Sequence, residues 1–290
     1  MLVEEFKNNL IEDGKSANTV QSKASDISAF IKYLRKMGVE FEGTLKRFYI
    51  TSYKNYLVDN SYEPATINKK VNSIGAFNNF LIEKSYMTEN VVDLKKDKIK
   101  IAYGSEEQVE VYSDNQLERI QFYIQNQKKV SLRDKMIIQL LMFTGVRVSE
   151  LCDIKLKNID FLLSQIKIMG KGGKMREVPV KFEVMDTIQE YISERNNNPY
   201  KASEYLILSQ RGAIRRDAVN TLLERHTLKG NFEMKLKPHT FRHTFCTRLI
   251  NKGIPITTVS KLAGHSSIET TAKFYINSSK EEKMKAVSLL

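Results

Sequence analysis

Cysteine and long apolar runs are scarce in this sequence. It has only two cysteines, Cys152 and Cys246, which cannot by themselves form a disulfide framework or a four-ligand zinc site. The uncharged stretch Met136–Val146 is well short of the ~18 to 20 residues that span a bilayer. Glu4 and Glu5 stand where a signal peptide would begin with basic residues. These absences predict an intracellular, soluble protein.

Positive charge is present in excess. The 290 residues carry a formal net charge of +12, and 41% are hydrophobic and 28% charged. This composition is ordinary for a globular protein and excludes disorder as the main state. The length allows one or two domains with their own cores. The charge favours a polyanionic partner such as nucleic acid, and the alternative is a solvated basic surface.

The first hundred residues have the periodicity of helices. Ser16–Thr19 provide a helix start, Ile50–Asp59 is a second helical segment, and Pro64–Thr66 open a third. Asp93–Lys100 is charged and weakly apolar, as expected of a connector. We therefore predict a helical domain at residues 1–98, a linker at 99–110 and a second domain at 111–290.

The second domain combines helices with a small sheet. Met136–Phe143 is apolar nearly all round, which indicates a buried helix that ends at Gly145. Gln165–Met169 and Arg176–Val180 alternate around a glycine-rich turn and predict a β-hairpin, and Tyr205–Leu208 predicts a further strand. The predicted fold class is mostly α, with a helical first domain and a mixed α/β second domain that has a small antiparallel sheet.

Four separated segments of the second domain offer polar groups for chemistry. The first is TGVRVSEL (Thr144–Leu151), in which Gly145 breaks one helix and Arg147 begins the next. The guanidinium can therefore project from a helix start. The alternative is an arginine that only pairs with Glu150 or Asp153.

The second segment is the tip of the hairpin, where Lys171 lies among Gly170, Gly172 and Gly173. A lysine on a turn can reach a bound phosphate, and glycines let the backbone approach it closely. The alternative is a solvated turn lysine. The glycine spacing is not that of a P-loop, so no nucleotide site is predicted.

The third segment places His239 and Arg242 three residues apart, and therefore on one helix face. Phe241, Phe245 and Leu249 form an adjacent apolar face that would anchor this helix in a core. A helix that buries its phenylalanines beside His and Arg indicates a site. Either polar residue alone would more often be structural.

The fourth segment follows a helix that Gly264 ends. His265 lies in the joint before the next helix, and Tyr275 follows about two turns further along. The alternative for the tyrosine is amphipathic packing. The four histidines lack a convincing set of metal ligands, so no metal site is predicted.

Together these residues form a metal-free set for phosphodiester transfer. Two arginines can bind a non-bridging phosphate oxygen and stabilise developing charge. A tyrosine can attack the phosphorus and conserve the bond as a phosphotyrosyl ester. A lysine or histidine can protonate the departing sugar oxygen.

The same segments resemble, in order and spacing, the tyrosine recombinase (phage integrase) family. The resemblance is carried by TGVRVSEL, by the Gly170-Lys-Gly turn, by His239-x-x-Arg242 and by Leu262-x-Gly-His265 followed by Tyr275. The sequence looks most like the compact Xer-type members and the integrases or resolvases of mobile elements. The first domain, with Ser16–Thr19 and Thr66–Lys70, is similar to the family's SAM-like core-binding domain, so the resemblance covers nearly the whole chain.

The resemblance implies a role for each polar residue. Arg147 and Arg242 would activate the scissile phosphate of double-stranded DNA, and Tyr275 would be the nucleophile that forms a 3′-phosphotyrosyl intermediate. Lys171 would be the general acid, and His239 and His265 would assist by hydrogen bonding and proton handling. No metal, ATP or other cofactor is implied.

The resemblance also implies an assembly. Four protomers would act on two paired DNA sites, and the C-terminal tail would dock on a neighbour through Met284, Val287, Leu289 and Leu290. The alternative is a tail that folds on its own domain. Accessory DNA-bending proteins are compatible with this scheme, which places the protein in the bacterial cytoplasm with nucleoid DNA and away from membranes.

Two rival functions stay open. A type IB topoisomerase shares this chemistry, and supercoil relaxation without a specific paired site would favour it. A site-specific DNA-binding protein with a silent active site would bind its DNA and form no covalent adduct. The direction of exchange, whether integration, excision, resolution or chromosome-dimer separation, is also open.

Overall fold

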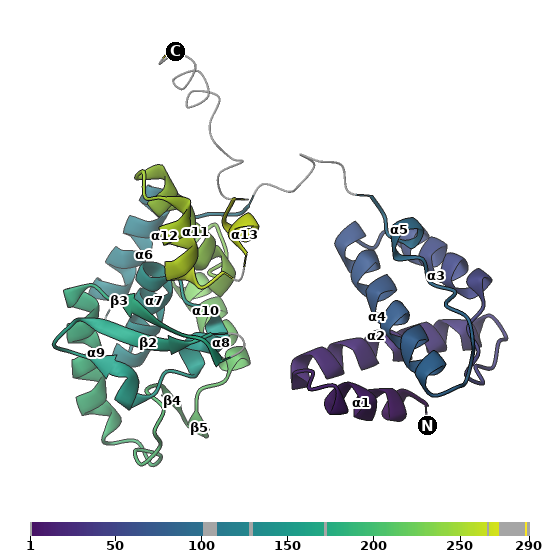
Figure 1. The fold of residues 1–290 in the computed structure, drawn as a ribbon. Helices are drawn as coiled ribbons and strands as arrows, with labels where there is room; N and C mark the ends of the chain where they lie inside the picture. Colours follow the sequence, from purple (N-terminus) through teal and green to yellow (C-terminus); the bar gives the residue numbers. More distant parts are fainter. Residues whose placement is uncertain are drawn as a thin grey trace. The chain divides into compact units, whose positions relative to one another are not determined.

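The computed structural model describes residues 2–100, 109–127, 130–170, 173–265, 267–272 and 288. The chain divides into two compact units, residues 1–106 and 107–290 (Figure 1). Each unit has a hydrophobic core of its own.

The first unit is helical. Ser16 caps its second helix, because the Oγ atom accepts a hydrogen bond from the backbone N–H of Thr19, and Pro64 occupies the first turn of its fourth helix. The helix starts predicted at these two residues are confirmed. The described helices are α1 (Leu2–Glu12), α2 (Ala17–Lys36), α3 (Arg47–Asp59), α4 (Pro64–Glu83) and α5 (Leu94–Asp97).

Phenylalanines form the centre of the first core. Phe6 of α1 packs edge-on against Phe77 of α4 with ring centroids 5.1 Å apart, and Phe77 stacks on Phe80 at 5.9 Å. All three side chains are buried. Burial of this aromatic area holds α1, a helix that the sequence analysis missed, against the rest of the unit.

The segment that follows α4 packs on the first unit instead of leaving it. Asp97 is 2% exposed and accepts hydrogen bonds from the Arg47 guanidinium. The Asn68 side-chain amide binds the backbone N–H of Ile99 at 2.7 Å and its carbonyl oxygen at 3.0 Å. The interpretation of Asp93–Lys100 as a connector is therefore corrected for residues 93–99. The Asp97 carboxylate forms its ion pair within the unit, which composition alone does not reveal.

The second unit contains the remaining described helices and all described strands (Figure 1). The helices are α6 (Asp114–Asn126), α7 (Leu132–Thr144), α8 (Val148–Cys152), the 3₁₀ turn η1 (Leu156–Asn158), α9 (Phe182–Arg195), α10 (Arg216–Lys229), α11 (Pro238–Asn251), α12 (Ile256–Ala263) and α13 (Ile268–Ala272). The strands are β1 (Ile159–Asp160), β2 (Gln165–Met169), β3 (Met175–Pro179), β4 (Leu208–Ser209) and β5 (Gly212–Ala213).

The sheets are small and antiparallel. β1, β2 and β3 form one sheet in that order, and the β2–β3 register pairs Gln165 with Pro179 and Met169 with Met175, so the predicted hairpin is confirmed. The strand predicted at Tyr205–Leu208 is displaced. Tyr205 forms a single bridge with Lys155, and the strand β4 begins only at Leu208.

The helix α7 runs through the second core. Met136, Ile137, Ile138, Leu140 and Leu141 are all fully buried, which confirms the buried helix predicted from its apolar character. With the helical first unit and the small sheets of the second, the fold is mostly α, as predicted.

Tyr112 attaches the segment before α6 to the start of α11. Its backbone N–H donates to Thr244 Oγ1 at 2.9 Å. Its hydroxyl donates to the carbonyl of Lys235 and accepts from the backbone N–H of Lys237, each at 2.9 Å. Its ring packs on Phe241 at 4.8 Å. The residues that follow the linker therefore help to hold α11.

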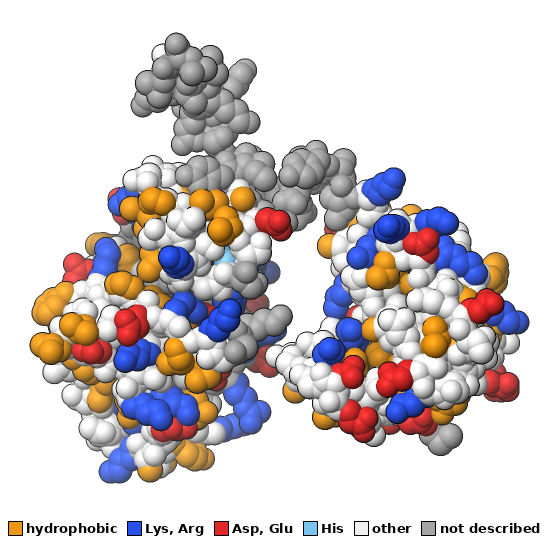
Figure 2. All heavy atoms as spheres, in the orientation of Figure 1, with side chains coloured by type: hydrophobic (Ala, Val, Ile, Leu, Met, Phe, Trp, Pro, Cys, Tyr) orange, Lys and Arg blue, Asp and Glu red, His pale blue; other side chains and the backbone are white. Residues whose placement is uncertain are grey.

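The surfaces of both units carry many basic side chains. On the face drawn in Figure 2, Lys and Arg side chains are spread over both units and are interspersed with acidic ones. In the part of the chain that the structure describes, no helix has the length and apolar character needed to span a membrane.

Candidate active site

The end of α7 and the helix α11 meet at Gly145. Gly145 ends α7 with φ of +62°, in the left-handed region that favours glycine. A Cβ atom there would lie 2.3 Å from a ring carbon of Phe245 on α11, so only glycine allows this approach. The carbonyl oxygen of Gly145 accepts a hydrogen bond from Arg242 Nη1 at 2.6 Å. The first and third predicted motifs are therefore in direct contact.

Arg147 begins α8 and is held by Glu150. The Glu150 carboxylate accepts from the backbone N–H of Arg147 at 2.9 Å and from its Nη1 at 2.8 Å. The pairing with Glu150 considered in the sequence analysis is thus present. The Arg147 guanidinium can still reach a ligand, because 34% of the Arg147 side chain is exposed whereas the Glu150 side chain is 5% exposed.

Arg242 is buried with part of its guanidinium unsatisfied. The residue is 3% exposed, and its Nη2 atom has no hydrogen-bond partner among the described residues. Burial and the nearby charge of Arg147 lower the pKa of Arg242 to about 10. A buried N–H donor without an acceptor is costly. The two guanidiniums repel each other, and one of them has an N–H donor without an acceptor. Such a pair can bind an anion such as phosphate.

His239 and His265 lie within range of both arginines. Burial, followed by the charges of Arg242 and Arg147, lowers the pKa of His265 to about 4 and also lowers the pKa of His239. Both imidazoles are therefore neutral at pH 7 and add no positive charge to the site. The Nδ1 atom of His265 lies 2.8 Å from Thr271 Oγ1, in hydrogen-bond contact across the joint between α12 and α13.

A third histidine, His243, stacks on His239. His243 lies one helical turn after His239 on α11, with ring centroids 5.6 Å apart and an interplanar angle of 21°. Burial and the neighbouring His239 and Arg242 lower the pKa of His243 to about 4. No group of three or more His, Cys, Asp or Glu side chains that could hold a metal ion occurs among the described residues. Both cysteines are free and buried.

Lys171 and Tyr275 lie outside the described residues, as do the tail residues Met284, Val287, Leu289 and Leu290. The hairpin that carries Lys171 is described up to Gly170, whose backbone N–H donates to the carbonyl of Lys174 at 2.7 Å. The structure thus brings together four of the six predicted residues: Arg147, His239, Arg242 and His265.

One charged residue of this site escaped the sequence analysis. Arg176 of β3 donates from Nη1 and Nη2 to the Glu150 carboxylate at 3.1 and 2.7 Å. A signal was available, because strand alternation puts Arg176 on the same face as Val178 and Val180, which are both buried. An arginine on the buried face of a strand requires a partner.

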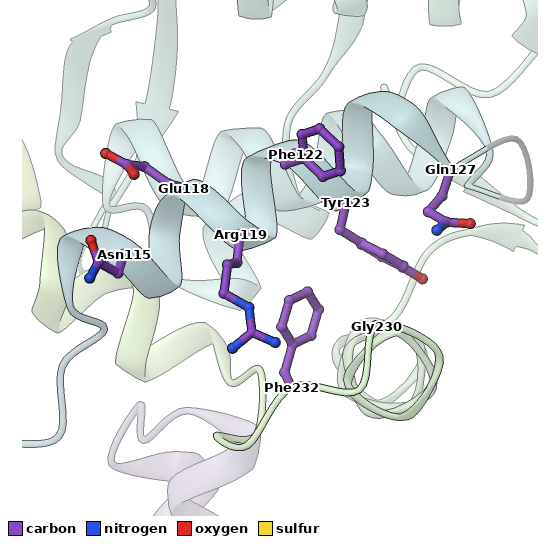
Figure 3. A pocket seen from close by; sticks show the side chains of 8 residues that line it. All are labelled: Asn115, Glu118, Arg119, Phe122, Tyr123, Gln127, Gly230 and Phe232. Carbon is purple, nitrogen blue, oxygen red and sulfur yellow. The ribbon is translucent and has the colours of Figure 1, made fainter.

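A groove of about 540 Å³ lies elsewhere in the unit (Figure 3). It is formed by one face of α6 and the segment after α10, and none of the four described residues of the site, Arg147, His239, Arg242 and His265, lines it. Phe122, Tyr123 and Phe232 contribute aromatic rings, and Arg119 points toward Phe232 (Figure 3). The paired arginines and the histidines beside them therefore lie apart from this groove.

The chain is similar to known proteins over most of its length. The Phage integrase family model matches residues 110–282, and the model of the phage integrase N-terminal SAM-like domain matches residues 3–85. The chain is 32% identical over 279 residues to the TnP I resolvase of Bacillus thuringiensis, covering 93% of each protein. It is 30% identical over 269 residues to the tyrosine recombinase XerC of Staphylococcus epidermidis, covering 91% of this chain and 88% of the relative.

A solved structure shows the same fold over the whole chain. The Tn1549 transposon integrase, in complex with transposon right end DNA, matches with a TM-score of 0.75 and 23% identity over 99% of both chains.

These matches define an enzyme that breaks and rejoins DNA strands. The chain belongs to the phage integrase family. It is a tyrosine-type site-specific recombinase, which breaks and rejoins DNA strands.

Proposed function

We propose that Arg147 and Arg242 bind the scissile phosphate of duplex DNA and that Tyr275 attacks its phosphorus. The observation that carries this proposal is the buried Nη2 atom of Arg242, which has no acceptor among the described residues and lies beside a second guanidinium. A non-bridging phosphate oxygen supplies the missing acceptor and relieves the repulsion between the two cations.

The reaction conserves the energy of the phosphodiester. A bond forms between the Tyr275 oxygen and phosphorus, and the bond from phosphorus to the 5′ oxygen breaks, which leaves a 3′-phosphotyrosine. Lys171 donates a proton to the departing 5′ oxygen. His239 and His265 are neutral at pH 7. They form hydrogen bonds at the phosphate, and one of them accepts the proton that the Tyr275 hydroxyl loses. Attack by the 5′-hydroxyl of a partner strand reverses these steps.

The partner is duplex DNA, which is bound by a core-binding domain, residues 1–98, and a catalytic domain, residues 111–290. The net charge of +12 supports a polyanionic ligand, and the Tn1549 integrase of the same fold was solved with transposon end DNA. Four protomers on two paired sites exchange strands, and tail residues Met284, Val287, Leu289 and Leu290 dock on a neighbour. The protein acts on DNA in the bacterial cytoplasm.

A trapped covalent adduct tests this function. Nicked duplexes that tile the DNA flanking the coding sequence are incubated with the full chain, so that cleavage beside the nick releases a short strand and prevents religation. A denaturing gel then resolves protein joined to DNA. An adduct that forms with the wild-type chain and is lost in Tyr275→Phe supports the proposal. Specific binding without an adduct contradicts it and favours the silent DNA-binding alternative.

A further inference from the structure

Arg176 connects the two segments that carry Arg147 and His265. Its Nη1 and Nη2 atoms donate to Glu150, and its Nε atom donates to the backbone carbonyl of Leu262 at 3.0 Å. All three guanidinium nitrogens are therefore engaged within the protein, and 14% of the side chain is exposed. Such a side chain is placed to hold other groups.

The first group that it holds is Arg147, through a shared carboxylate. Oε1 of Glu150 accepts from Nη1 of both arginines, and Oε2 accepts from the backbone N–H of Arg147 and from Nη2 of Arg176. The Glu150 carboxylate cannot move without breaking bonds to both partners. One carboxylate between two guanidiniums also leaves a net positive charge, so Arg147 keeps its attraction for a phosphate.

The second group is the joint that precedes His265. The Leu262 carbonyl lies in the last turn of α12, where helical carbonyls lack intrahelical partners and a cation is favoured. Gly264 ends this helix with φ of +68°, and a Cβ atom there would lie 2.6 Å from Nη1 of Arg176. The guanidinium therefore occupies the space that a side chain at position 264 would need, and it fixes where the chain turns into His265.

We propose that Arg176 is a positioning residue for DNA cleavage, which sets the guanidinium of Arg147 through Glu150 and the place of His265 through the end of α12. The inference rests on the proposed roles of Arg147 and His265. A lysine keeps the charge at this position, but its single ammonium group cannot reproduce three directed hydrogen bonds to two separate elements.

Single-turnover cleavage of a nicked duplex that the wild-type chain cleaves tests the inference. The variants are Arg176→Lys, Arg176→Gln, Glu150→Gln and the double variant. Arg225→Lys is the matched control, because Arg225 also donates to a buried carboxylate of the same unit, that of Asp134 at 2.6 Å, and is not among the residues of the site. The rate constant, the reaction amplitude, the DNA dissociation constant and the melting temperature are measured for each chain.

A positioning role changes the rate constant. Arg176→Lys is expected to lower it at least about tenfold, since small misplacements of catalytic groups have effects of this size. The amplitude and the DNA dissociation constant stay within about threefold, and Arg225→Lys stays within about twofold of the wild-type rate. The effects of Arg176→Gln and Glu150→Gln on the rate constant are expected not to add, so the double variant is no slower than the slower single variant.

Three results overturn the inference alone while the wild-type chain reacts: a wild-type rate constant in Arg176→Lys, a loss confined to amplitude and melting temperature, or additive effects of the two glutamine substitutions. A wild-type chain that binds its DNA without forming an adduct overturns the proposed function, and the role of Arg176 with it.

Discussion

Replacing Arg242 by methionine is expected to stabilise the free protein while it abolishes cleavage. The pKa of Arg242 is lowered to about 10, well below that of an ordinary arginine, so at about 1.4 kcal/mol for each pKa unit its charge destabilises the folded chain by about 3 kcal/mol. Both values lie above pH 7, so the guanidinium is charged in the folded and unfolded chains and the full effect applies at neutral pH.

The hydrogen bond to Gly145 opposes this gain. Its loss costs about 2 kcal/mol, as is usual for a bond from a charged donor. The expected net change for Arg242→Met is therefore a stabilisation of about 1 kcal/mol, which corresponds to roughly 2 to 4 °C in the melting temperature of a unit of this size. The buried charge that we propose binds a phosphate is thus expected to lower the stability of the protein without DNA.

Thermal and urea unfolding without DNA measure this change, and Arg195→Met is the control. Arg195 is also 3% exposed, but it donates to the backbone carbonyls of Lys201, Ser203, Tyr205 and Leu206. Its loss leaves these carbonyls without that donor and is expected to cost about 3 to 5 kcal/mol. An Arg242→Met chain that melts below the wild type would refute the view that Arg242 is an unsatisfied cation.

Three further predictions concern other parts of the second unit. Gly264→Ala forces an L side chain into the left-handed region against Arg176, which should destabilise the unit by about 1 to 2 kcal/mol. It should also slow adduct formation on the nicked duplex by at least about tenfold, because it displaces groups of the site. The pKa values of His243 and His265 are lowered to about 4 in the folded chain, so the unfolded chain binds more protons as the pH falls from ~6.5 to 4. The free energy of unfolding should therefore decrease over this range. Urea titrations of the wild type and of His243→Gln at several pH values would show a shallower pH dependence in the variant. Burial raises the pKa of Asp134, but hydrogen bonds from His226 and Arg133 bring it to about 2, so Asp134→Asn should cost about 3 to 5 kcal/mol in thermal unfolding while the cleavage rate constant at low temperature stays unchanged.

Local signals in the sequence were sufficient for most of the fold. The Ser16 cap and Pro64 mark helix starts because they act on backbone groups within one turn. The glycine-rich turn marks the hairpin for the same reason. Leu206 and Ile207 are buried, but the β4–β5 ladder begins only at Leu208, so hydrophobicity alone placed a strand too early along the chain.

The tertiary contacts of the site could not be predicted in this way. Arg147 and Arg242 were found because their motifs are local, but the carboxylate that joins Arg147 to Arg176 depends on residues 26 positions apart, and the Arg176–Leu262 bond on residues 86 apart. Sequence spacing does not reveal such contacts. The buried face of β3 indicated only that Arg176 needed a partner.

The attachment of Tyr112 to α11 matters for anyone who designs a shortened chain. Val109 packs against the cluster formed by Cys246, Ile250 and neighbouring apolar residues, and Tyr112 supplies hydrogen bonds to Thr244 and to the loop before Pro238. A fragment that begins at the helix α6 would lack these contacts to α11, the helix that carries Arg242. The second unit expressed by itself should therefore start before Val109, within residues 101–108, even though its first helix begins only at Asp114.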